Sequence, residues 1–161
     1  MANTLYNIIV PVNFSNRDKW SIAKAIELAN AFQCNIHLVY VVNDPWLAMR
    51  KWSHWFLYDT TAVLTNARKQ LDDLRNEYRQ HMVGNGKIAI SLLKGERSRE
   101  LVDYIKKFEM DLVVMGLSKF SLTQRILSSV TISTLSRKTS VPVLAIRASG
   151  LVSHFKKIVL P

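Results

Sequence analysis

Two kinds of segment alternate along the chain: short runs that are almost wholly apolar, and longer stretches in which apolar residues recur every three or four positions. Apolar runs between polar turns are typical of strands covered on both faces, whereas the spacing of three and four indicates amphipathic helices. The runs predict strands at 6–12, 34–42, 87–95, 111–116 and 141–147, and the spacing predicts helices at 17–32, 64–78, 96–108 and 128–138.

The order of these elements predicts a single α/β domain. Strands and helices alternate, so we expect a five-stranded parallel sheet with helices on both faces, a three-layer sandwich joined by right-handed crossovers. In such sheets ligands bind beyond the carboxyl ends of the strands, where the strand order reverses. The length of 161 residues fits one domain, which we place at residues 1–150. Ser15 and Asp18 resemble a capping box at the start of the first helix.

A tryptophan-rich segment separates the second strand from the second helix. Trp46, Trp52 and Trp55 lie between residues 43 and 61, which also hold Phe56 and Tyr58. We favour the interpretation that these rings pack beneath a long connection. A ligand lid or a partner surface is the alternative.

The C-terminal residues 151–161 form a tail or linker. The hexapeptide "KKIVLP" at 156–161 repeats the pattern of "YNIIVP" at 6–11. Such an echo after the last strand is expected where a tandem copy begins, but the same residues also suit an added edge strand. Both interpretations remain open.

The charge is strongly basic and unevenly placed. The formal net charge is +10, and from residue 112 onward the chain contains neither Asp nor Glu. Such a surface attracts nucleic acid, anionic membranes or nucleotide phosphates, or it is only a solvated surface. Because no recognised nucleic-acid-reading motif accompanies the charge, nucleic acid is not the partner that we expect.

Cysteine content and N-terminal sequence bear on the compartment. The single cysteine, Cys34, has no partner for an intramolecular disulfide, which suits a reducing compartment. The N-terminus lacks the pattern of a signal peptide, and no apolar run reaches the length of a membrane span. We therefore expect a soluble, cytoplasmic protein that does not act on a membrane.

The sequence offers no catalytic constellation. The four histidines are far apart and have no metal-site spacing: His37, His54, His81 and His154. Nothing near Arg97 and Arg99 pairs a nucleophile with a base, and "GLSKF" around Ser118 is not a nucleophile elbow. We predict no metal site, no catalytic residue and no enzymatic activity.

Four stretches resemble the universal stress protein family. They are "NIIVPVNFS" in the first strand, "AKAIELANAFQCNIHLVYVV" through the first helix and second strand, "DLVVMG" in the fourth strand, and "SSVTISTLSRKTSVPVLAIR". The resemblance covers nearly all of residues 5–148. It implies a nucleotide-binding, Rossmann-like sheet of the adenine nucleotide alpha hydrolase-like type, usually dimeric through its last strand. Some members of the family bind ATP and others do not.

The resemblance also locates a phosphate loop, from which this chain departs. ATP-binding members carry Gly, two residues, Gly, nine residues, Gly, and then Ser or Thr, because glycine lets backbone N–H groups approach the phosphates. Here Gly116 is kept, but Lys119 and Ser128 stand at the other glycine positions, the interval between them is one residue short, and Ser129 follows. We interpret the loop as degraded.

The ribose side of the site departs as well. Binding members usually place Asp after the first strand, whereas this chain has Asn13, whose neutral carbonyl oxygen is a weaker acceptor. The nucleotide contacts implied by the resemblance are Pro11, Val12, Asn13, Val41, Met115, Gly116, Lys119, Ser128, Ser129 and Val130.

We therefore predict a stress-response domain that acts by association. It is expected to form a homodimer, or to pair with a tandem copy, and to bind an unidentified protein partner. The strand predicted to dimerise comprises Val141, Pro142, Val143, Leu144, Ala145 and Ile146. No cofactor is certain. The alternative is a switch that binds ATP or another adenine nucleotide, in which the charge of Lys119 compensates for the missing glycines.

Overall fold

The structure of the chain, a computed structural model, describes residues 5–42, 60–117 and 131–147. In chain order its elements are β1 (Asn7–Pro11), α1 (Asp18–Phe32), β2 (Asn35–Val42), α3 (Thr60–Arg79), β3 (Ile88–Lys94), α4 (Arg97–Lys107), β4 (Leu112–Leu117) and β5 (Val143–Arg147). Residues 131–138 are also helical. Each predicted strand and helix is present, with ends that differ by a few residues.

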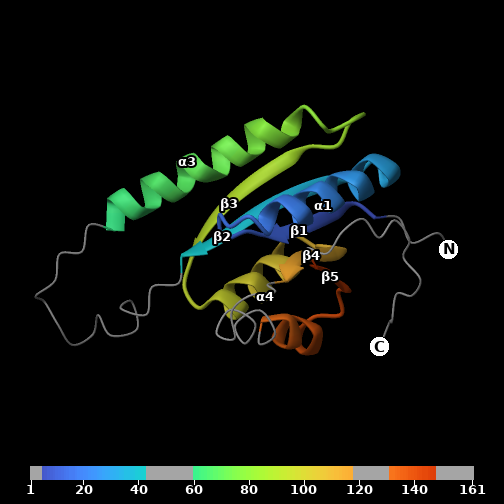
Figure 1. Cartoon of the computed structure of the whole chain (residues 1–161). Helices are drawn as coiled ribbons and strands as arrows, with labels where there is room; N and C mark the ends of the chain where they lie inside the picture. The colour runs from blue at the N-terminus through green and yellow to red at the C-terminus, as the bar shows by residue number, and fades with distance from the viewer. Residues whose placement is uncertain (1–4, 43–59, 118–130, 148–161) are drawn as a thin grey trace, which may run out of the picture.

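The strands form one parallel sheet in the order β3-β2-β1-β4-β5. Figure 1 shows α1 and α3 over one face of the sheet and α4 over the other. The predicted five-stranded parallel sheet with helices on both faces is therefore confirmed. Successive connections run from β1 toward β3 and then from β4 toward β5, so the strand order reverses between β1 and β4.

The core explains why the strands read as uninterrupted apolar runs. Ile8 and Val10 of β1 belong to the cluster that contains Ile22 of α1 and Leu71 of α3. Ile9, between them, belongs to the cluster on the opposite face, with residues of α4. All three β1 side chains are fully buried. Alternate residues thus enter two different cores, and each buried side chain contributes about 1.5–3 kcal/mol.

The starts of α1 and α4 are stabilised in different ways. Glu96 caps α4, because its carboxylate accepts hydrogen bonds from the backbone N–H groups of Ser98 and Arg99. Burial acts to raise the pKa of Glu96, but these two bonds, together with the Ser98 hydroxyl and the charge of Lys138, hold the pKa below its usual range. The capping box predicted for α1 is formed only in part: Asp18 accepts a hydrogen bond from the N–H of Ser15, but Arg17 occupies the N-cap position and makes no side-chain cap bond.

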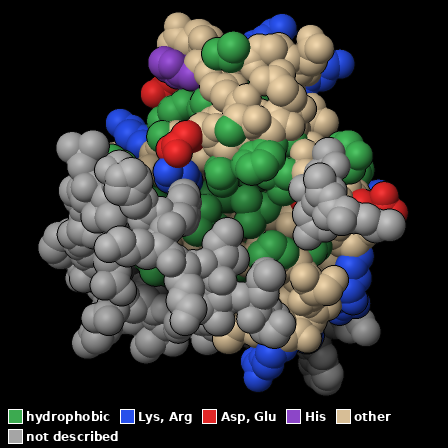
Figure 2. Space-filling model, turned by 90° about the vertical axis from the view of Figure 1, so that its right-hand side faces the viewer, with side chains coloured by type: hydrophobic (Ala, Val, Ile, Leu, Met, Phe, Trp, Pro, Cys, Tyr) green, Lys and Arg blue, Asp and Glu red, His purple; other side chains and the backbone are tan. Residues whose placement is uncertain are grey.

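The surface of the described residues is mixed in character. Figure 2 shows hydrophobic side chains gathered near the middle of one side of the molecule, with Lys and Arg side chains toward its border. The large hydrophobic side chains that remain exposed are Tyr6, Trp20, Phe32, Val63, Val83 and Phe108. None of the helices in the described ranges has the length and apolar character that a membrane span requires.

Candidate functional site

The register of the sheet brings three of the predicted contact segments together at the carboxyl ends of the strands, which we call the carboxyl edge. Pro11 pairs with Val39 of β2, and the N–H of Val12 donates to the carbonyl of Val39 at 2.9 Å. On the other side of β1, Ile9 pairs with Val113 of β4. The carboxyl ends of β1, β2 and β4 therefore lie next to one another where the strand order reverses. This edge is the expected place for a ligand.

Most of the predicted side chains at this edge face the core. Val12 is buried in the cluster beneath α1 and α3, whereas Val41 and Met115 are buried in the cluster beneath α4. Pro11 is half-buried. These residues form a rigid floor, and their side chains offer no polar group to a ligand.

The second half of the predicted site lies outside the described residues. It comprises Lys119, Ser128, Ser129 and Val130. Their role in holding phosphates stays a prediction that rests on the resemblance.

Asn13 is folded back onto its own loop. Its side-chain oxygen accepts a hydrogen bond from the N–H of Ser15 at 3.2 Å. A carbonyl oxygen has two lone pairs, so one remains for a ligand. The ribose contact predicted at Asn13 is thus weakened both by the missing charge and by an internal bond.

Asp18 is the residue that the sequence reasoning missed as part of this site. Its side chain is nearly fully buried, and Oδ2 accepts hydrogen bonds from the N–H groups of Asn13 at 2.9 Å and Ser15 at 3.1 Å. Burial raises the pKa of Asp18, and hydrogen bonds from the backbone of Asn13, Ser15 and Phe14 partly offset the rise. These backbone N–H donors therefore favour the ionised form of the Asp18 carboxyl group, which burial disfavours.

The N–H groups of Asn13 and Ser15, in the loop before α1, converge on the carboxylate of Asp18. Consecutive N–H groups at the start of a helix attract phosphates and carboxylates. Here the internal carboxylate of Asp18 takes that position and adds a negative charge beside the predicted nucleotide site. An acidic residue in the first turn of a helix that follows a strand and a short loop was the available sequence signal.

Gly116 has a steric reason to be glycine that does not involve phosphate. A Cβ at this position would lie 2.9 Å from the carbonyl oxygen of Arg17 and 3.1 Å from its Cβ. The end of β4 thus packs directly against the residue that precedes α1. The retained glycine alone is therefore weak evidence for a working phosphate loop.

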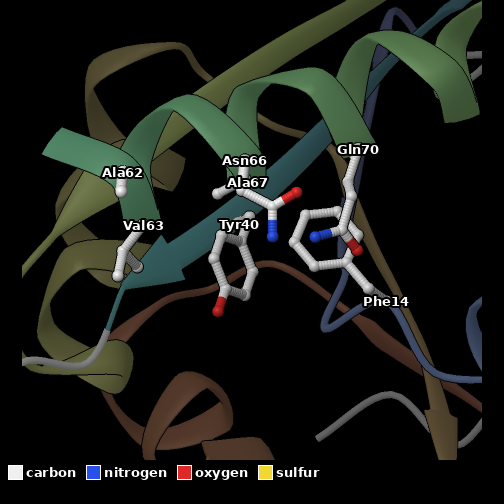
Figure 3. A pocket seen from close by; sticks show the side chains of 7 residues that line it. All are labelled: Phe14, Tyr40, Ala62, Val63, Asn66, Ala67 and Gln70. Atoms are coloured by element: carbon white, nitrogen blue, oxygen red, sulfur yellow. The ribbon is translucent and has the colours of Figure 1, made fainter. Parts of the chain in front are cut away.

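An apolar groove opens beside the same edge (Figure 3). The rings of Phe14 and Tyr40 have centroids 4.5 Å apart, and Phe14 has a left-handed backbone with φ of 59°. Asn66 and Gln70 of α3 extend over these rings, and the groove has a volume of about 430 Å³. None of its lining residues is charged. The groove was not predicted, although the alternation in β2 places Tyr40 on the side of Leu38, facing α3.

The described ranges contain no group of three His, Cys, Asp or Glu side chains that could hold a metal ion. One polar chain does cross the α4 side of the sheet. The hydroxyl of Tyr104 lies 2.9 Å from Nδ1 of His37 and 2.9 Å from Oγ of Ser91. Burial lowers the pKa of His37 and raises that of Tyr104. Because Tyr104 stands between the serine and the imidazole, these contacts do not form a nucleophile with its own base.

Comparison with protein families gives one match over most of the chain. Residues 5–147 match the family described as the universal stress protein family. A universal stress protein of Methanocaldococcus jannaschii is 23% identical over 146 residues, which cover 90% of this chain and 84% of the relative. Neither the family description nor the name of this relative specifies an enzymatic reaction.

Solved structures show the same fold. The universal stress protein UspA of Lactobacillus plantarum is 23% identical, with a TM-score of 0.65 over 88% of this chain and 97% of its own. A universal stress protein of Archaeoglobus fulgidus, solved in complex with dAMP, is 16% identical, with a TM-score of 0.59 over 88% and 98%. At these identities the likeness establishes the fold.

We predict that Asp18→Ala lowers the free energy of unfolding by about 1–3 kcal/mol, because it leaves the part-buried N–H donors of Asn13 and Ser15 without their acceptor. Asp18→Asn is the matched control, since it keeps one acceptor oxygen and should cost less. Urea unfolding followed by circular dichroism measures both. Equal losses in the two variants would contradict the assigned role of the carboxylate oxygen.

Proposed function

The chain belongs to the universal stress protein family, and we propose that it acts as a stress-protein domain by association through β5, with a reduced nucleotide site. The observation that carries this proposal is the outer edge of β5, along which no described strand lies. In the described part of the chain, β4 is the only strand that pairs with β5.

The hydrogen bonds of β5 identify which backbone groups face outward. Val113 donates its N–H to the carbonyl of Pro142 at 3.0 Å. Since alternate residues of a parallel ladder bond to the same neighbour, the even-numbered residues of β5 bond to β4. The N–H and C=O groups of Val143 and Ala145 then point to the outer edge, where a second strand can accept and donate hydrogen bonds.

The side chains of β5 suit a strand that is covered in an assembly. Val143, Leu144 and Ile146 are only half-buried in the single chain, and Ala145 is exposed. An apolar edge strand without a covering element favours pairing with another strand. We propose an antiparallel β5–β5 homodimer in the cytoplasm. A tandem copy in a longer chain would use the same edge intramolecularly, and another protein could take its place.

We predict that Ala145→Pro converts the dimer into a monomer. Proline removes the outward N–H while the ladder to β4, made by the even-numbered residues, stays intact. Ala145→Ser keeps the N–H and should remain dimeric. Light scattering after size exclusion measures the mass, and circular dichroism verifies folding. A monomeric parent chain at tens of micromolar, or a folded dimer of the proline variant, would contradict the proposal.

The second candidate function is adenine nucleotide binding at the carboxyl edge of the sheet. The complex of the Archaeoglobus fulgidus protein with dAMP favours it. So does the position of Asn13, Val41 and Gly116 at or just beyond the carboxyl ends of the neighbouring strands β1, β2 and β4. Against it stand the buried carboxylate of Asp18 and the internal bond of Asn13. In this candidate, the positive charge of Lys119 replaces the backbone N–H contacts that the missing glycines would have allowed.

Calorimetric titration with ATP, with and without magnesium, separates the two candidates. The leading proposal predicts a dissociation constant weaker than about 1 mM. Micromolar binding that Lys119→Ala abolishes would establish the nucleotide switch instead. Lys138→Ala is the matched control, because it removes the same charge from the exposed end of the helix at 131–138.

A further inference from the structure

β3 is the edge strand at the end of the sheet away from β5, and half of its backbone N–H and C=O groups point outward. It pairs with β2 along all seven residues from Ile88 to Lys94. Ile36 donates to the carbonyl of Lys87, and Gly95 donates to the carbonyl of Val42. Both bonds involve odd-numbered residues of the β3 segment. The even-numbered residues of β3 therefore direct their N–H and C=O groups to the outer edge.

Apart from Lys94 at its end, β3 lacks the devices that usually prevent strand pairing. Edge strands are commonly protected by proline, by charged side chains or by bulges. From Ile88 to Leu93 the strand has neither proline nor a charged residue, and its pairing with β2 runs without interruption. Protected edge strands are also often very short, whereas β3 has seven residues.

A groove runs along the same edge, between the two helices that flank it. Its volume is about 430 Å³, and its lining includes Ile90 and Leu92 of β3, Arg68 of α3 and Lys107 of α4. Phe108, which follows α4, also lines the groove and is 41% exposed. The outward backbone groups of β3 thus lie at a recess with apolar and charged walls.

The charges of α4 are ordered along this groove. Glu100 lies beside Gly95 at the carboxyl end of β3, and Tyr104 contacts Ser91 near the middle. Lys107, one turn further along α4, therefore lies toward the amino end of β3. With Asp103 also in the lining, the α4 wall of the groove is acidic near the carboxyl end of β3 and basic near its amino end, whereas Arg68 on the α3 wall forms an ion pair with Asp72.

We propose that this groove binds an extended peptide segment of a partner protein, added to β3 as an antiparallel sixth strand. Added strands gain affinity from main-chain hydrogen bonds and specificity from side-chain pockets. The charge order selects a segment that begins with a basic residue, facing Glu100 and Asp103, and ends with an acidic residue, facing Lys107. Apolar residues between them contact Ile90 and Leu92. The β3 strand of a second copy does not fit this order, because it ends in Lys94, which would face Lys107.

The test uses the full chain and a labelled probe peptide of the same seven-residue length as β3. The peptide has lysine first, glutamate last, and valine and threonine alternating between them. Fluorescence anisotropy should show saturable binding, and the same peptide with proline at its centre should not bind. Absence of binding at millimolar peptide would overturn the proposal.

Two neighbouring lysines provide a matched pair of variants. Lys107→Glu should weaken binding about threefold to tenfold, because an attraction becomes a repulsion. Lys106→Glu makes the same charge change outside the groove lining and should change affinity less than about twofold. A peptide with lysine at both ends should restore binding to the Lys107→Glu variant. Equal effects of the two substitutions would overturn the assigned position of the peptide.

Amide hydrogen exchange then tests strand addition itself. Saturating peptide should slow the outward amides of Ile90 and Leu92 by about tenfold or more, while the amides of Ala89 and Ser91, which bond to β2, keep their rates. Equal slowing of all four amides, or no slowing, would contradict an added strand.

Discussion

β1 hydrogen-bonds to β2 on one side and to β4 on the other, and this double parallel ladder determines where the remaining parts of the molecule lie. It buries Ile8 and Ile9 on opposite faces and places the reversal of strand order next to the end of β1. An open parallel sheet also ends in two edge strands, whose outward backbone groups need water or another chain. β3 and β5 are these strands, and both proposed associations arise from that requirement.

The loop after β1 shows how internal hydrogen bonds can occupy groups that lie beside a predicted ligand site. Its N–H groups still converge, as they do in phosphate-binding loops, but they converge on the carboxylate of Asp18. Gly116 is retained because the end of β4 packs against Arg17, whether or not a phosphate binds. Packing and internal hydrogen bonds therefore explain features that would otherwise be attributed to a nucleotide.

The fold could be predicted because each strand carries its own signal. Residues buried on both faces must all be apolar, so local composition located β1, β2 and β4. The site was less predictable, since it depends on the backbone dihedral angles of the loop after β1. The contact between Asn13 and Asp18 requires the left-handed turn at Phe14, which φ of 59° reveals and no local pattern indicates. Likewise, the recess beside β3 depends on the packing of two helices that are distant in sequence.

The central claim is that the outer edge of β5 pairs in solution, and amide hydrogen exchange as a function of protein concentration tests it most directly. The account predicts that the outward amides of Val143 and Ala145 exchange about tenfold more slowly at high concentration, whereas those of Leu144 and Ile146, bonded to β4, are slow throughout. Fast exchange of Val143 and Ala145 at every concentration would contradict association through this edge.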